Sequence, residues 1–153
     1  MKTFKFKDYP TLTDGEIDVV IDEKRPAGFH PGWVPSYEYH ICLHGQPEPI
    51  GHISLRIGDV KNITMYGGHI GYRVDEPYRG HHYAAKACNI VKQVALDYGF
   101  KTLWITCNPD NIASRKTCEA IGCELIDIVD LPEDNDMYLE GERQKCRYKW
   151  EIG

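Results

Sequence analysis

The stretch GGHIGYRVDEPYRGHHYAAKA, residues 67–87, decides the fold class of this chain. Residues 68–74 are a predicted strand, and a short turn follows it. A helix is predicted over residues 80–98, because apolar side chains then recur at intervals of three and four and Gly99 ends the pattern. The apolar stripe of this helix consists of Ala84, Cys88, Val91, Ala95 and Tyr98. The change from strand to helix indicates a fold that mixes the two.

The start of this helix is suited to holding a phosphate group. The first turn of a helix has unpaired backbone N–H groups and the positive end of the macrodipole. Gly80 allows a ligand to approach the backbone, Arg79 supplies a charge, and Ala84 keeps the first turn small. The stretch is neither a Walker A loop nor a dinucleotide fingerprint, because its other glycines lie before or within the strand. An ordinary capped connection between strand and helix is the alternative.

The rest of the chain continues the mixture of strands and helices without repeats or linkers. Further strands are predicted at residues 16–22, 37–44, 50–57, 102–107, 123–129 and 143–152, and a second helix at 111–121. Residues 23–36 contain three prolines and are predicted to form an ordered, irregular loop. This order predicts a mixed α/β fold in a single domain over residues 1–153.

The composition excludes several classes of function. The 153 residues are 42% hydrophobic and 27% charged, which is typical of one soluble domain with a core. A net charge of −5 argues against nucleic-acid binding by phosphate neutralisation. We expect neither membrane association nor secretion, because no segment is a membrane helix or a signal peptide. Six cysteines without a C-x-x-C pair indicate a cytoplasmic protein.

The junction at residues 71–84 resembles the acyl-CoA motif of the GNAT-type N-acetyltransferase superfamily, and in detail a small group of uncharacterised bacterial acetyltransferases. In the motif R/Q-x-x-G-x-G/A, Arg79 and Ala84 match the first and last positions. His82 replaces the middle glycine, and His81 stands where relatives often carry Lys or Arg. The resemblance implies a mostly antiparallel sheet with helices on both faces, and acetyl-CoA bound by Val74, Arg79, Gly80, His81, His82, Tyr83, Ala84, Asn111 and Ser114.

A second stretch, NPDNIASRKTCEAIG at residues 108–122, is similar to another landmark of the same family. Asn111 matches the asparagine that contacts the pantetheine arm, although an asparagine before a helix commonly caps it. Ser114 matches a position that is small or hydroxyl-bearing. Many relatives carry a tyrosine seven residues after the asparagine, and it is thought to protonate the leaving thiolate. Cys118 stands there, either as the acid or as a buried residue that only packs.

The resemblance implies direct transfer of an acetyl group from acetyl-CoA to a primary amine in a ternary complex. The amine must be neutral to attack, so the site needs a base or a proton path. His69 and Tyr72, on opposite faces of the predicted strand, join Cys118 as the candidate catalytic residues. We expect a backbone N–H near Val74 to stabilise the oxyanion. No metal is expected, because the triplet His40-x-Cys42-x-His44 has no fourth ligand.

The acceptor, a small-molecule or peptide amine, is expected between residues 23–36 and the last hairpin. The prolines exclude the two helices that family members usually have in that segment, so the acceptor pocket departs from the family. Phe29, Trp33 and Tyr37 are candidate walls of the pocket, with plain packing under the loop as the alternative. The acidic residues within 130–142 either attract a cationic amine or form a solvated loop.

A second function stays open, namely a non-catalytic acyl-CoA-binding or regulatory module on the same fold. It is supported by His82 in place of a glycine and Cys118 in place of a tyrosine. A phosphate-binding protein outside the family is a poorer explanation, because two separate landmarks occur in the family's order. A homodimer is possible if the last predicted strand, residues 143–152, pairs across a subunit edge.

Overall fold

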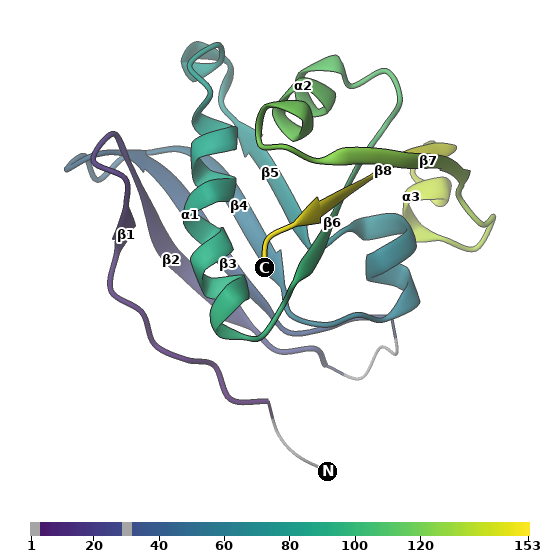
Figure 1. The fold of residues 1–153 in the computed structure, drawn as a ribbon, viewed down its shortest axis with the longest axis horizontal. Coiled ribbons are helices and arrows are strands. Elements are labelled where there is room, and N and C mark those ends of the chain that lie inside the picture. The colour runs from purple at the N-terminus through teal and green to yellow at the C-terminus, as the bar shows by residue number, and fades with distance from the viewer. Residues whose placement is uncertain (1–3, 29–31) are drawn as a thin grey trace.

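The described residues, 4–28 and 32–153 of a computed structural model, form two antiparallel sheets with helices (Figure 1). The larger sheet has the strand order β1-β2-β3-β4-β5, and the smaller one β6-β8-β7. The strands are β1 (Leu12–Thr13), β2 (Ile17–Arg25), β3 (Ser36–Leu43), β4 (Pro49–Arg56), β5 (Ile70–Val74), β6 (Thr102–Cys107), β7 (Glu124–Asp130) and β8 (Gln144–Glu151). The helices are α1 (Tyr83–Asp97), α2 (Ile112–Ala120) and α3 (Asp136–Leu139), with a π-helical turn η1 (Asn62–Gly67) and a 3-10 turn η2 (Glu76–Tyr78). The mixed α/β class expected from the sequence is confirmed.

The two sheets meet at the start of β5 without forming a continuous ladder. The backbone N–H of His69 donates to the carbonyl of Trp104 on β6 at 2.7 Å. Gly68 has a φ of +76°, and a Cβ there would lie 3.0 Å from the same carbonyl, so only glycine fits this approach. Beyond this point β5 pairs with β4 alone, which leaves its other edge free.

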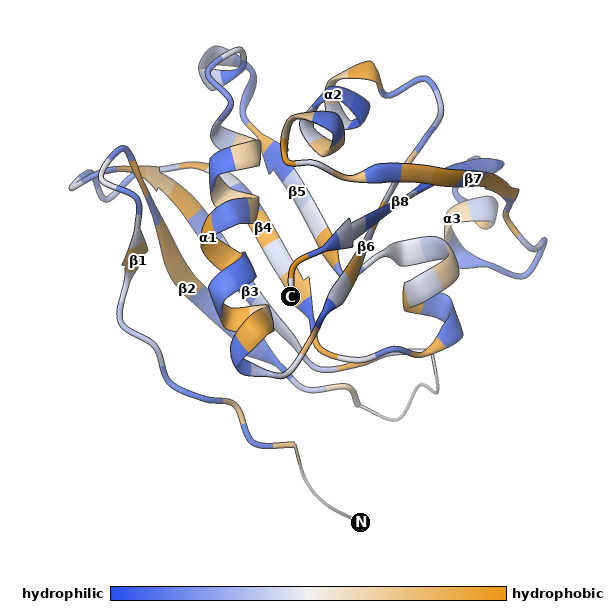
Figure 2. Cartoon of the chain, viewed as in Figure 1, coloured by the Kyte–Doolittle hydropathy of each residue, from blue (hydrophilic) through white to orange (hydrophobic). Residues whose placement is uncertain are grey.

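Helix α1 covers the apolar face of the larger sheet (Figure 2). It buries small and aliphatic side chains against strands that contribute Val19, Ile41, Ile53 and Ile70. The buried residues of α1 are Ala85, Ala87, Cys88, Ile90, Val91, Val94 and Ala95. The helix begins at Tyr83, three residues later than predicted, because Gly80 and His82 both have a positive φ that a right-handed helix does not allow.

The opposite face of the larger sheet is polar. Side chains alternate along a strand, so the residues between the apolar ones of β2, β3 and β4 point away from α1. They include His52, which lies 3.1 Å from Glu38, and His40, which lies 3.2 Å from Asp22. Glu38 is only 8% exposed, so this face contains ionisable groups that are largely removed from water.

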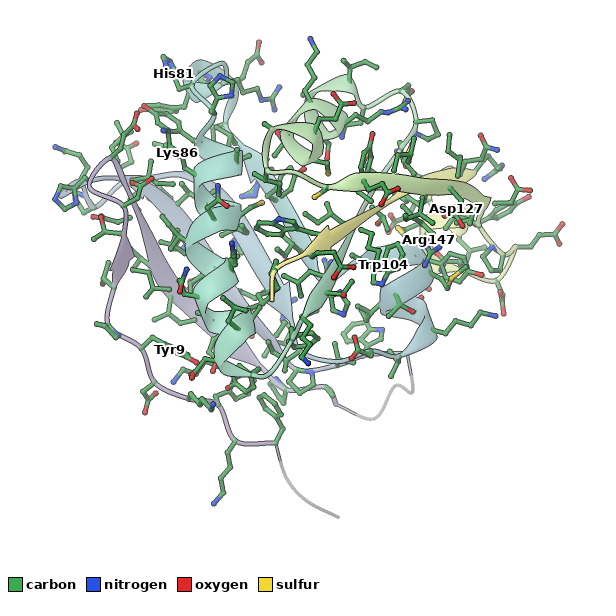
Figure 3. The ribbon with its side chains drawn as sticks, in the orientation of Figure 1. Tyr9, His81, Lys86, Trp104, Asp127 and Arg147 are labelled. Atoms are coloured by element: carbon green, nitrogen blue, oxygen red, sulfur yellow. The ribbon has the colours of Figure 1, made fainter. Side chains whose placement is uncertain are left out.

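The smaller sheet is held to η1 by Arg147 on β8. Its guanidinium forms two bonds of 3.0 and 3.1 Å to Asp127 on β7, and it lies 4.1 Å from the ring centre of Trp104 on β6 (Figure 3). The same side chain donates to the carbonyl of Thr64. One arginine therefore joins all three strands to the turn that precedes β5.

Several expectations about the course of the chain need correction. Strand β2 continues to Arg25 and β3 begins at Ser36, so the irregular segment is shorter than residues 23–36. A short helix, α3, lies within the acidic segment. Strand β8 lies between β6 and β7, so it offers no edge for a homodimer; β6 and β7 are the edge strands of this sheet. None of the helices in the described residues is long and apolar enough to cross a membrane.

Candidate functional site

A groove of about 540 Å³ lies between the end of β5, the start of α1 and the first turns of α2. We call it the α1–α2 groove. Its lining residues are Tyr72, Arg73, Val74, Tyr78, Arg79, Gly80, His82, Tyr83, Ala84, Asn111, Ala113, Ser114, Lys116 and Thr117. Eight of the nine residues predicted to bind the cofactor are therefore in one place. The exception is His81, whose ring stacks on Tyr83 with 5.3 Å between ring centres, at the loop before α1 (Figure 3).

The loop that leads into α1 presents backbone donors to this groove. Among the described residues, His82 is the one non-glycine residue with a positive φ, at +62°, and Gly80 has a φ of +90°. The side chain of His82 makes no capping hydrogen bond, so the N–H groups of the first turn stay open to a ligand. His82 thus keeps a left-handed conformation that a glycine would adopt without strain.

Arg79 ties this loop to the end of β5. Its Nε donates to the carbonyl of Val74 at 2.8 Å, while the side chain remains exposed at the groove. The bond uses only Nε, so the two Nη groups keep their donors for a ligand. The positive charge of Arg79 is thereby held beside the start of α1. The charge and the helix N-terminus both favour an anion there.

The free edge of β5 forms the floor of the groove. The N–H of Asp75 donates to Ile50 on β4, and in an antiparallel pair such bonds recur at every second residue. Residues 71 and 73 therefore bond to β4, whereas the N–H groups of Tyr72 and Val74 point away from it. These two donors are available to a ligand lying along β5.

Asn111 and Ser114 connect the start of α2 to the groove. The Oδ1 of Asn111 accepts from the N–H of Ser114 at 3.2 Å, so Asn111 caps α2 and lines the groove as well. The Ser114 hydroxyl lies 2.8 Å from the Tyr72 hydroxyl. Burial raises the pKa of Tyr72, so its hydroxyl keeps its proton at neutral pH.

Cys118 lies behind Tyr72 and does not line the groove. It is fully buried, with its sulfur 3.8 Å from the Tyr72 hydroxyl. A hydrogen bond from the Cys123 thiol lowers the pKa of Cys118, and the same bond raises that of Cys123. The position that carries a tyrosine in many relatives therefore offers no group to the groove, whereas the Tyr72 side chain beside it lines the groove.

His69 lies away from the groove, at the junction of the two sheets. It is fully buried, its Nδ1 accepts from the N–H of Trp104 at 2.9 Å, and its Nε2 lies 2.9 Å from Asp59. Burial lowers the pKa of His69. Both ring nitrogens thus join segments of the fold, and His69, selected from the sequence as a candidate base, does not line the groove.

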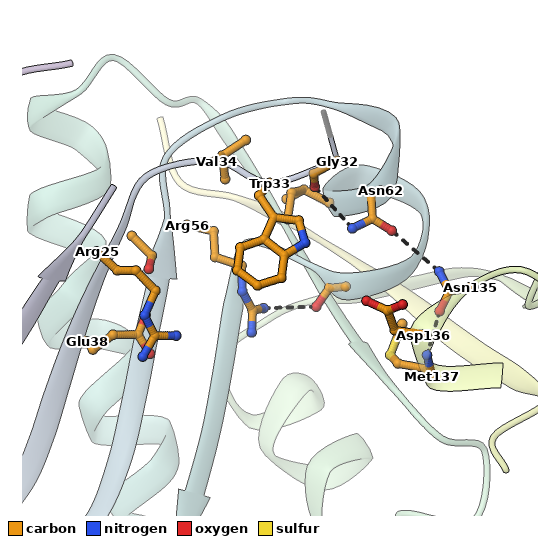
Figure 4. Close-up of a pocket in the computed structure, with 13 residues that line it drawn as sticks. Arg25, Gly32, Trp33, Val34, Glu38, Arg56, Asn62, Asn135, Asp136 and Met137 are labelled. Atoms are coloured by element: carbon orange, nitrogen blue, oxygen red, sulfur yellow. Dashed lines mark hydrogen bonds between the residues drawn. The ribbon is translucent and has the colours of Figure 1, made fainter. Parts of the chain in front are cut away.

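A second cavity, of about 270 Å³, lies on the polar face of the larger sheet (Figure 4). We call it the Arg56 pocket. It is lined by Arg25, Gly32, Trp33, Val34, Ser36, Glu38, Arg56, Asn62, Ile63, Gly67, Asn135, Asp136 and Met137. It lies where the acceptor was expected, between the segment before β3 and the loop between β7 and β8. Sequence patterns missed Arg25, Glu38 and Arg56, because nothing in a strand sequence shows that its polar face borders a cavity.

The aromatic residues expected to wall an acceptor pocket behave differently from one another. Trp33 lines the Arg56 pocket and is 51% exposed. Tyr37 does not line this pocket; it is buried on the other face, and its hydroxyl lies 2.6 Å from that of Tyr98. Phe29 lies outside the described residues. No metal-binding group of three or more His, Cys, Asp or Glu occurs within residues 4–28 and 32–153.

Solved structures with a similar fold include several acetyltransferases. The microcin C7 self-immunity acetyltransferase MccE, solved with acetyl-CoA and AMP, has a TM-score of 0.58 and 21% identity over 76% of this chain and 61% of its own. The ribosomal-protein-S5-alanine acetyltransferase of Vibrio fischeri has a TM-score of 0.60 and 17% identity, over 76% of this chain and 62% of its own. The Salmonella typhimurium acetyltransferase that modifies the N-terminal serine of ribosomal protein L7/L12 has a TM-score of 0.60 and 21% identity, over 77% of this chain and 64% of its own. The chain thus spans less than two thirds of each.

The sequence comparisons agree with the fold. No curated protein sequence matches the chain significantly. The model of the acetyltransferase (GNAT) domain matches residues 3–124, which include the junction before α1 and both helices that border the groove. The chain therefore belongs to the GNAT acetyltransferase family.

Proposed function

We propose that this protein transfers an acetyl group from acetyl-CoA to a primary amine by direct attack in a ternary complex. The observation that carries the proposal is the α1–α2 groove, which combines an anion site with the free edge of a strand. The anion site suits a pyrophosphate, and the strand edge suits an extended chain that contains amides. Acetyl-CoA has both parts, and its thioester supplies the activated acetyl group.

The residues of the groove divide into two regions. Arg79, Gly80 and the first turn of α1 hold the pyrophosphate through charge and backbone N–H groups. The N–H groups of Tyr72 and Val74 bond to the pantetheine arm or to the acetyl carbonyl. Asn111 borders the opposite side of the groove, where the amide nitrogen of its side chain serves as a donor.

Two groups on β5 assist the chemistry. The N–H of Val74 donates to the oxygen that becomes negative when the amine attacks the acetyl carbonyl. The Tyr72 hydroxyl donates a proton to the departing thiolate, since it borders the groove and stays protonated at neutral pH. We assign this role to Tyr72 in place of Cys118, because Cys118 is fully buried behind it.

A non-catalytic acyl-CoA-binding module remains the second candidate. The observation that favours this module is that Cys118 presents no group to the groove. The choice between the two functions therefore depends on whether Tyr72 can supply the proton. A cytoplasmic location fits either function, because all six cysteines are free thiols.

Calorimetric titration with acetyl-CoA, desulfo-CoA and ADP tests the first part of the proposal. Acetyl-CoA and desulfo-CoA are expected to bind with similar affinity, and ADP more weakly because it lacks the pantetheine arm. Release of free CoA is then followed with a panel of amines. Binding without turnover on any amine would favour the non-catalytic module, and absence of binding would overturn both functions.

A further inference from the structure

The Arg56 pocket is built from segments that are far apart in the sequence. The Nδ2 of Asn62 on η1 donates to the carbonyl of Gly32 at 3.1 Å, and the Nδ2 of Asn135 donates to the Oδ1 of Asn62 at 3.4 Å (Figure 4). These bonds join three loops around an opening whose floor is the polar face of the sheet. Hydrogen bonds therefore link the segments that wall the pocket.

Arg56 provides a largely buried positive charge at this floor. Its Nη1 donates to the carbonyls of Gly67 and Gly68, at 3.1 and 3.0 Å. Among the described residues, which include every Asp and Glu of the chain, no carboxylate forms an ion pair with it. Glu38, in the same pocket, acts on the charge of Arg56 without forming an ion pair with it. Burying a guanidinium is costly, and a carboxylate that enters the pocket and bonds to Arg56 directly offsets part of that cost.

The charges that line the pocket are balanced. Arg25 and Arg56 are positive, and Glu38 and Asp136 are negative (Figure 4). Arg25 is ion-paired to Glu23 at 3.0 Å, and Glu38 contacts His52 at 3.1 Å. A ligand that matches this lining carries both signs of charge and no net charge.

The pocket adjoins the strand that forms the floor of the α1–α2 groove. A Cβ placed on Gly71 would lie 3.0 Å from Nη2 of Arg56, so the guanidinium rests against β5 one residue before Tyr72. The Arg56 pocket lies on the polar face, whereas α1 covers the other face. A ligand in the pocket thus approaches β5 from the face opposite to α1.

We propose that the Arg56 pocket binds an amine acceptor that also bears a free carboxylate, that is, an amino acid, with Arg56 and Arg25 holding the carboxylate. Glu38 and Asp136 attract the ammonium group before it loses its proton. This inference rests on the proposed acetyltransferase function and names its substrate class.

Two other acceptor classes match the pocket less well. A polyamine would place several positive charges beside two arginines, and of the six acidic residues in segment 130–142 only Asp136 lines the pocket. A phosphate-bearing ligand with two negative charges would be repelled by Glu38 and Asp136. A volume of about 270 Å³ also suits a molecule of amino-acid size.

The test compares each amino acid with its own carboxamide and with the amine that lacks the carboxylate. With the full chain and acetyl-CoA, we expect kcat/KM for the free amino acid to exceed that for the amide by about tenfold or more. Arg56→Gln and Arg25→Gln are expected to bring this ratio close to one. Arg143→Gln, in a loop residue outside the pocket, is the matched control and should keep the ratio. Arg25 is exposed, so its variant remains informative if Arg56→Gln fails to fold.

Direct titration with the same compounds separates this inference from the proposed function. Acetylation of amines with an acid-to-amide ratio near one would overturn the amino-acid proposal and leave the acetyltransferase function standing. Absence of acetylation, together with Arg56-dependent binding of free amino acids, would support the pocket and reject the function. Equal binding of acid and amide in the absence of acetylation would reject both.

Discussion

The hydroxyl of Tyr72 on β5 lies 2.8 Å from the hydroxyl of Ser114 on α2, at the floor of the α1–α2 groove. This contact joins the two parts of the chain that border the groove, and the sulfur of Cys118 lies just behind it at 3.8 Å. The hydroxyl is therefore held between α2 and Cys118, and burial keeps it protonated, so it has a proton to donate.

Tyr72→Phe is expected to lower kcat by about a hundredfold, the usual contribution of a general acid, with little change in acetyl-CoA affinity. Stopped assays of CoA release and calorimetry measure the two quantities. Tyr138→Phe, in a tyrosine outside the groove, is the control. A Tyr72→Phe enzyme with wild-type kcat would show that the hydroxyl only supports α2.

Cys118→Ala separates proton donation from packing. Because the thiol is fully buried and does not line the groove, we expect turnover to stay within a few-fold of wild type. The loss of a buried sulfur should lower the free energy of unfolding by about 1 kcal/mol, as measured by urea denaturation. A large loss of kcat at unchanged stability would return the role of acid to Cys118.

Arg79→Glu is expected to weaken acetyl-CoA binding by about tenfold or more, since it places a negative charge beside the pyrophosphate site. The side chain is exposed, so folding should be little affected. Arg79→Lys retains the charge and loses the Nε bond to Val74, so its affinity for acetyl-CoA should lie between those of wild type and Arg79→Glu. Unchanged affinity in Arg79→Glu, measured by calorimetry, would refute this placement of the pyrophosphate.

His82→Gly is expected to raise the free energy of unfolding by about 0.5–1 kcal/mol, because the φ of +62° is strained for any residue with a Cβ. His81→Gly is the matched control, since His81 has no positive φ and gains nothing from glycine. Urea denaturation of both variants measures the difference. A stability gain in the control equal to that of His82→Gly would remove backbone strain as the cause.

Acid lability tests the carboxylate of Asp18. Hydrogen bonds from His44, Thr13 and the N–H of Gly45 lower the pKa of Asp18 to about 2. Because the pKa of Asp18 is lower in the folded state than in the unfolded state, its ionised carboxylate stabilises the fold. This stabilisation, about 2 kcal/mol, is present above about pH 4 and is lost as the pH falls toward 2.

Asp18→Asn should remove that dependence. Between about pH 5.5 and about pH 2, the variant is expected to lose about 2 kcal/mol less stability than wild type, as measured by urea denaturation. Asp134→Asn, in an exposed residue, is the control and should follow wild type. Equal acid-induced losses in all three proteins would show that Asp18 is not a source of acid lability.

The local features of this protein could be predicted from the sequence. Glycine and proline positions and the periods of two and 3.6 residues depend on neighbours along the chain. They located β5 and α1, and they predict an anion site at Arg79 and Gly80. The left-handed backbone at His82 delayed the start of α1, an effect that a hydrophobic pattern cannot show.

Only the tertiary structure decided which residues share a site. His69 and Tyr72 are three residues apart, yet one joins the two sheets and the other reaches Ser114 in the groove. The Arg56 pocket combines β2, β3, β4, η1 and the loop before β8, over a span from residue 25 to residue 137. The sequence by itself determined the elements and the family motif, because short-range chemistry sets them. The pairing of the strands and the burial of charge determined the proposed acceptor site, because they depend on contacts between distant segments.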